Sequence, residues 1–210
     1  EAILEHLGIW AEQGRWSDLS PLLAVLERSE PKLPKEFECE YLLLKGKSLR
    51  GMGDLEGAEE VLHSTMNHQM ATEVVALEAR TLLCSVQALR GHYSSAIENL
   101  TVALTNMNLT SRERGELSYW LAFSSLHLGK YDEVMALEAE SRSYLGKDDE
   151  THREVKSRLL RTSGLAHLYK GNGEEARAFF MKARGAAEGL LLELASVDSC
   201  LALLHFRDRH

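Results

Sequence analysis

Cysteine and proline are scarce in this chain of 210 residues, which contains only 3 of each. The cysteines, Cys39, Cys84 and Cys200, lie far apart and show neither a CxxC motif nor the Cys/His spacing of a zinc site. This pattern argues against a disulfide framework and is typical of a reducing compartment, so we expect a cytoplasmic protein. The rarity of proline leaves few residues that would break a long helix.

Long apolar runs and an excess of basic residues are also absent. No stretch reaches the roughly 18 apolar residues that a membrane-spanning helix needs, and no signal peptide opens the chain. The net charge is −8, and the densest basic stretch, residues 151–161, spreads its charges around a solvated helix. An acidic protein of this kind repels a phosphate backbone. We therefore expect neither a membrane nor a nucleic acid as a direct partner.

Motifs for catalysis, metal binding and cofactor binding are missing as well. The glycines form neither GxxxxGK[ST] nor a strand-borne GxGxxG, and HExxH is absent. Nine histidines occur, but His63 and His68 are five residues apart, which points them to different faces of a helix. The sequence therefore predicts a protein that is not an enzyme, with no catalytic residue, no metal and no cofactor.

The chain does contain a repeat, marked by evenly spaced glycines. Intervals of 39, 38, 38 and 42 residues separate Gly14, Gly53, Gly91, Gly129 and Gly171. A long apolar-periodic segment rich in helix formers precedes each glycine, and a second one follows it. Each unit is therefore predicted to consist of a helix A, a tight glycine turn and a helix B.

Small residues recur on both sides of each turn. Seven residues before the turn glycine stand Gly46, Cys84, Ala122 and Gly164. Five residues after it stand Ala58, Ala96 and Ala176, with Val134 and Leu19 in the other two units. Small side chains at a crossing let two helix backbones approach closely. The two helices of a unit should therefore pack as an antiparallel pair.

This layout resembles the tetratricopeptide repeat (TPR). One unit matches its pattern at Gly46, Gly53, Leu55 and Ala58, and the next at Gly91, Tyr93, Ala96 and Ala103. The family's Trp and closing Pro are missing from most units, and the spacing exceeds the usual 34 residues. The longer period is similar to that in sensor domains of large bacterial LuxR-type activators related to the maltose regulator, and of some antibiotic-type transcriptional regulators. The resemblance implies an all-α fold, a right-handed superhelix (α-solenoid) of about five helix pairs plus a partial sixth.

We expect a single TPR-like domain over residues 1–210. Its units span about residues 1–30, 35–70, 71–108, 111–147, 150–188 and, as a partial unit, 190–210. The last unit has a helix A, residues 190–206, without a helix B. Because the chain begins without Met and stops abruptly, we expect a piece of a longer protein. The apolar face of the last helix predicts either a following repeat or self-association through the C-terminal end.

The inner, concave face of such a solenoid is formed by the A helices. In the register that the resemblance implies, five residues on this face stand out: Lys47, Arg50, Tyr119, Phe123 and Arg161. Aromatic and basic side chains together suit an apolar ligand or a peptide with a carboxylate or phosphate end. The alternative is that the aromatic residues pack against neighbouring helices and the basic residues pair with Glu40 or Glu78.

Two functions fit this face. The first is the non-catalytic sensor or interaction region of a bacterial transcriptional or signalling regulator, with a protein, a peptide or a small-molecule effector in the concave groove. The second is a free-standing TPR adaptor or co-chaperone that binds extended peptides or helices. The regulator should also contain a nucleotide-binding or DNA-binding domain, and neither motif occurs in these residues.

Overall fold

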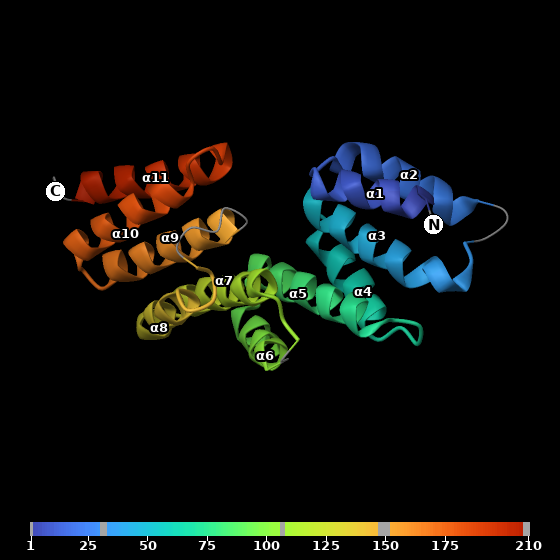
Figure 1. Cartoon of the computed structure of the whole chain (residues 1–210), viewed down its shortest axis with the longest axis horizontal. Helices are drawn as coiled ribbons and strands as arrows, with labels where there is room; N and C mark the ends of the chain where they lie inside the picture. The colour runs from blue at the N-terminus through green and yellow to red at the C-terminus, as the bar shows by residue number, and fades with distance from the viewer. Residues whose placement is uncertain (1, 30–32, 106–107, 147–151, 208–210) are drawn as a thin grey trace. The chain divides into compact units, whose positions relative to one another are not determined.

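A computed structural model describes residues 2–29, 33–105, 108–146 and 152–207 of the chain (Figure 1). These residues form eleven α-helices and one short 3-10 helix, and no strand occurs among them. The prediction of an all-α fold is therefore confirmed. None of the described helices is both long and apolar enough to cross a membrane.

The helices gather into two compact units, residues 1–92 and residues 93–210, which we describe separately. Unit 1 contains α1 (Ala2–Glu12), α2 (Trp16–Arg28), η1 (Lys35–Phe37), α3 (Glu38–Met52), α4 (Leu55–Met66) and α5 (Glu73–Leu89). Unit 2 contains α6 (Tyr93–Leu104), α7 (Ser111–His127), α8 (Tyr131–Ser141), α9 (Arg153–Tyr169), α10 (Gly173–Ala186) and α11 (Leu191–Arg207).

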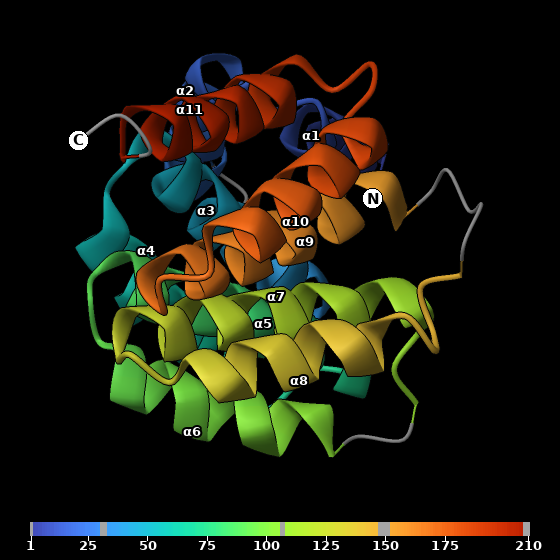
Figure 2. The same ribbon diagram turned by 90° about the vertical axis from the view of Figure 1, so that its left-hand side faces the viewer.

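Within each unit, helices that follow one another pack side by side. In unit 1, α3 packs against α4 and α4 against α5 (Figure 1). In unit 2, α7 packs against α8, α9 against α10, and α11 against both α9 and α10 (Figure 2). The third predicted pair, α5 and α6, is divided between the two units. The repeat boundaries predicted at residues 1, 30, 147, 150 and 210 lie outside the described residues, and the single domain stays a prediction.

The five periodic glycines end five helices in the same way. All of them have a positive φ, between 68° and 86°. At the end of α3, for example, the Gly53 N–H donates to the carbonyl of Arg50 at 3.1 Å and the Asp54 N–H donates to that of Leu49 at 2.9 Å. This pair of hydrogen bonds satisfies the last carbonyls of the helix, and it needs a left-handed residue that only glycine adopts without strain.

Two of the predicted close crossings are seen directly, between α3 and α4 and between α9 and α10. A Cβ added to Gly46 would lie 2.6 Å from Leu62 of α4, and one added to Gly164 would lie 2.5 Å from Phe180 of α10. Both Leu62 and Phe180 are fully buried. In both pairs, a large side chain of helix B therefore packs directly on the small residue of helix A. This large residue stands nine positions after the turn glycine.

Cys84 stands at the small-residue position of α5 and is fully buried, which raises the pKa of its thiol to about 12. The unfolded chain loses this proton near pH 9, whereas the folded chain retains it. The free energy of unfolding should therefore fall by about 1.4 kcal/mol for each pH unit between 9 and 12 because of this group. Urea denaturation at several pH values should show a flatter decline for Cys84→Ala than for the parent chain. Parallel declines of the two proteins would contradict the burial of this thiol.

Candidate functional site

Two of the five predicted site residues, Lys47 and Arg50, lie on α3 in unit 1. The ammonium nitrogen of Lys47 lies 2.6 Å from a carboxylate oxygen of Glu78 on α5. Lys47 therefore forms an ion pair with Glu78, as the alternative interpretation of the basic residues predicts. Arg50 lies in the last turn of α3 and is half-buried. In this unit Lys47 therefore links two A helices, and its charge is already paired.

The other three residues lie in unit 2, where Tyr119 and Phe123 belong to one aromatic cluster on α7. The ring centroids of Tyr119 and Phe123 are 6.2 Å apart, and Trp120 lies 5.7 Å from Phe123. Tyr119 and Trp120 are buried, whereas Phe123 is half-buried. The cluster thus anchors α7 in the core and leaves part of one ring accessible.

Tyr93 of α6 and His127 of α7 extend this cluster toward solvent. The two rings are parallel, with their centroids 4.7 Å apart, and Phe123 meets His127 edge to face at 4.6 Å. His127 is exposed and Tyr93 is half-buried. Tyr93, Tyr119, Trp120, Phe123 and His127 form what we call the aromatic face, which runs from α6 across α7.

Arg161, the last predicted residue, projects from α9 toward α11. One of its terminal guanidinium nitrogens lies 4.0 Å from Glu193 on α11. Its buried Nε has no hydrogen-bond partner among the described residues. Burial raises the pKa of the nearby Tyr119 hydroxyl, and the positive charge of Arg161 opposes that rise only in part. Tyr119 is therefore an uncharged, mostly apolar side chain at physiological pH.

Arg158 connects the two sides of this region, although the sequence interpretation assigned it to a solvated helix. Its side chain is only 25% exposed, and its Nε donates to Glu193 at 2.9 Å. A second carboxylate, Glu154, also pairs with it, and Glu116 of α7 lies 3.7 Å away. The guanidinium carbon lies 5.5 Å from the centroid of the Tyr119 ring. This one cation therefore ties α7, α9 and α11 together.

A regular signal for this network was present in the sequence. Glu116 and Arg158 each stand thirteen residues before their turn glycines, and Glu40 and Glu78 hold the same place in units two and three of the repeat. A charged residue thus recurs at one position in the A helices of units two to five, one turn before the predicted inner residues. Glu193 and His127 carry no comparable signal, because each belongs to the site through a neighbouring helix or the end of α7. Tyr93, in contrast, is part of the repeat pattern, two residues after Gly91.

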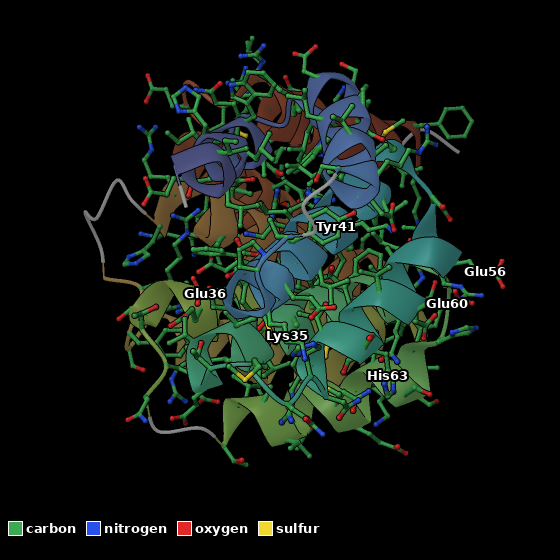
Figure 3. The ribbon with its side chains drawn as sticks, turned by 90° about the vertical axis from the view of Figure 1, so that its right-hand side faces the viewer. Lys35, Glu36, Tyr41, Glu56, Glu60 and His63 are labelled. Carbon is green, nitrogen blue, oxygen red and sulfur yellow. The ribbon has the colours of Figure 1, made fainter. Side chains whose placement is uncertain are left out.

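Unit 1 contains a separate open hollow of about 810 Å³ beside α4, lined mostly by polar residues. Lys35, Glu60 and His63, which are labelled in Figure 3, are among the residues that line it. His68, which also lines it, accepts a hydrogen bond at Nδ1 from the Met70 backbone N–H at 3.2 Å.

Because that ring nitrogen carries no proton, the thiol of Cys39 donates to it across 3.0 Å. Cys39 is buried, which raises the pKa of its thiol. The described residues include no group of three His, Cys, Asp or Glu side chains that could hold a metal ion. The Cys39–His68 contact therefore fastens the segment after α4 to the start of α3.

Comparison with known proteins gives matches in fold. No family model and no curated protein sequence matches the chain. MamA from AMB-1, in crystal form P212121, is 18% identical over 88% of this chain and 97% of its own, with a TM-score of 0.60. MamA from MSR-1, in crystal form C2, is 17% identical over 88% and 94%, with a TM-score of 0.59.

A further MamA structure from AMB-1, in crystal form C2221, is 16% identical over 87% and 95%, with a TM-score of 0.57. Identities this low establish a common fold and nothing about activity. The resemblance to LuxR-type sensor domains is not shown by these matches. MamA is a TPR-like helical protein, and this chain is likewise a TPR-like all-α solenoid.

Proposed function

We propose that this chain is a non-catalytic adaptor that binds a peptide or helix of a partner protein on the aromatic face of unit 2. The observation that carries the proposal is the stepwise exposure of the cluster, from buried Tyr119 and Trp120 through half-buried Phe123 to exposed His127. A rigid ring surface of this kind offers contact area with little loss of side-chain entropy on binding.

The charges next to the aromatic face favour an apolar side chain of the partner. Arg158 is already surrounded by carboxylates, and Arg161 shares Glu193 with it. An anionic group of a ligand would have to compete with these internal partners. We therefore assign recognition mainly to Phe123 and His127, and a secondary role to the Arg161 guanidinium.

The adaptor hypothesis requires only a TPR-like fold and the aromatic face as a binding surface. The sensor role in a transcriptional or signalling regulator, which was the main sequence interpretation, requires further domains and finds no support in the fold matches. The cytoplasmic location and the small-molecule effector stay predictions from the sequence.

Selection of random displayed peptides on the 210-residue chain tests the proposal. Peptides that bind the parent chain should bind His127→Ala and Phe123→Ala at least about tenfold more weakly, because central aromatic residues carry much of the energy of an interface. His127 is exposed, so its replacement leaves the fold intact. Val102→Ala, an exposed position on α6, serves as the control. Undiminished binding by both aromatic variants, or no selected peptide at all, would contradict the proposal.

A further inference from the structure

Two pairs of aromatic rings lie beside the glycine turns of unit 2, and both pairs occupy the same positions of the repeat. Tyr93 and Tyr131 each stand two residues after a turn glycine, at the start of a B helix. His127 and Tyr169 each stand two residues before the next turn glycine, at the end of an A helix. The ring centroids are 4.7 Å apart in the pair Tyr93–His127 and 6.0 Å apart in the pair Tyr131–Tyr169. We call these two pairs the ring steps.

The A-helix ring of each step is exposed. Tyr169 is 52% exposed, and His127 is likewise exposed. Leu128, which is 43% exposed, lies in the turn between the two steps. This exposure does not arise at a terminal helix, because α10 and α11 follow α9 in the same unit. Exposed apolar surface therefore continues from the aromatic face across the α7–α8 turn to the end of α9.

Packing of the repeat does not require the two exposed rings. In unit 1 the same two positions hold Trp16 and Gly51, and a Cβ added to Gly51 would lie 2.3 Å from the Trp16 ring. The B-helix ring there packs directly on the backbone of the A helix. His127 and Tyr169 therefore add aromatic surface beyond what the fold needs, and such surface marks a site of interaction.

The distance between the ring steps restricts the conformation of a partner. The A helices α7 and α9 pack against each other, and the axes of helices in contact are about 8–10 Å apart. Because both steps stand at the same place of the repeat, about the same distance separates them.

Three regular conformations differ in how often they present a side chain on one face. A β-strand does so about every 6.7 Å, and an α-helix does so about every 5.4 Å, which gives about 10.8 Å for two turns. A polyproline II helix has three residues per turn and a rise of about 3.1 Å, which gives about 9.3 Å. Of the three, the polyproline II helix matches the spacing of the ring steps.

Polar groups beside the second step suit the backbone of such a segment. A polyproline II helix makes no internal hydrogen bonds, so its carbonyl oxygens accept from the receptor or from water. Tyr131 and Tyr169 each carry a hydroxyl that can donate to a carbonyl. Their neighbours Asp132 and Lys170 form an ion pair at 2.6 Å, so the charges next to this step are already compensated. The second step therefore favours an uncharged segment over an ionic one.

We propose that the partner of the aromatic face is a proline-rich segment in the polyproline II conformation. It crosses the α7–α8 turn and places residues one helical turn apart on the two ring steps, one against His127 and one against Tyr169. Proline-rich segments bind to aromatic surfaces in this way because their backbone is already ordered before binding. This inference rests on the proposed function and specifies the ligand of the same face.

Fluorescence anisotropy with a labelled oligoproline of about nine residues, which spans about 28 Å, tests the inference on the 210-residue chain. The oligoproline should bind the parent at least about tenfold more tightly than a glycine–serine peptide of equal length, which is disordered before binding. His127→Ala and Tyr169→Ala should each weaken binding about tenfold, because each removes one ring. Tyr169→Phe keeps the ring and should weaken binding about threefold. Met181→Ala, at an exposed position of α10, should bind as the parent does.

A shorter oligoproline tests whether one segment occupies both steps. A peptide of about three residues is one turn long and cannot reach from one step to the other. It should bind more weakly than the long peptide, and Tyr169→Ala should reduce its binding by no more than about twofold, because the step at His127 remains. Both ring variants replace exposed side chains, so circular dichroism should show an unchanged helix content.

Three results would overturn the inference. The first is that displayed peptides bind the aromatic face while the oligoproline does not, which would leave the proposed function in place with a ligand of another conformation. The second is that the glycine–serine peptide binds as tightly as the oligoproline. The third is that Tyr169→Ala binds the long oligoproline as tightly as the parent does, which would restrict the contact to the first step. If neither the oligoproline nor any displayed peptide bound, the proposed function would fail together with this inference.

Discussion

Replacing Phe180 with alanine is expected to lower the free energy of unfolding of the chain by about 3–5 kcal/mol. Phe180 is fully buried at the crossing of α9 and α10, where its ring lies directly over Gly164. Glycine has no side chain that could turn into the space left by the ring, so a cavity remains. A loss of this size is a large part of the roughly 5–15 kcal/mol that stabilises a domain. Urea denaturation followed by circular dichroism measures it.

The double variant Gly164→Leu/Phe180→Ala tests whether this loss comes from the crossing itself. Alone, Gly164→Leu should destabilise the chain, because its side chain would overlap the Phe180 ring. Together with Phe180→Ala it should recover part of the loss, since the new side chain fills the cavity from the other helix. Met181→Ala, at a position that is 54% exposed, should change stability by less than about 0.5 kcal/mol. Additive losses in the double variant would show that the two residues do not share one space.

The turns and crossings could be predicted from the sequence because their causes are local. A left-handed turn favours glycine whatever surrounds it, so the glycine period predicted the order of the ten helices that flank the five turns. The position of Gly164 relative to Gly171 then gave the small side of the crossing. These features depend on a few consecutive residues and on helix geometry alone.

Glu138 shows where that logic fails. It stands nine residues after Gly129, at the place that Leu62 and Phe180 occupy in their units, and it is only 3% exposed. Both of its carboxylate oxygens accept hydrogen bonds from the Arg142 guanidinium, at 2.9 and 2.6 Å. A Glu–Arg pair four residues apart looks the same in sequence when it lies in solvent. Burial of such a pair depends on packing that the repeat pattern does not contain.

The candidate site was predictable only as a helix face. Spacing from the turn glycine placed Tyr119 and Phe123 on one side of α7, where the structure shows them within one cluster. The spacing could not predict that Lys47 pairs with Glu78, or that Arg158 pairs with Glu193, because each partner lies on another helix. Long-range pairing requires the relative positions of helices, and periodicity along one helix does not give them.

Arg158→Met is expected to lower the free energy of unfolding by about 3–5 kcal/mol, the second large effect. Methionine retains the apolar stem that lies beside Tyr119 but removes the charge. Glu193 is buried, and without Arg158 its carboxylate would face Glu116 and Glu154 with only the more distant Arg161 to balance it. Chemical denaturation at neutral pH and constant salt measures the change.

Glu193→Gln in the Arg158→Met background should restore much of the lost stability, because it removes the buried charge and keeps the shape of the side chain. The coupling between the two substitutions then gives the interaction free energy of the pair. Arg15→Met is the matched control: its partner Asp18 is 49% exposed, and the loss should stay below about 1 kcal/mol. If Arg158→Met were as mild as Arg15→Met, the Glu193 carboxylate would have to reach water. In that case Arg158 and Arg161 would be available to an anionic ligand, and recognition on the inner side of unit 2 would shift from the aromatic face to these two guanidinium groups.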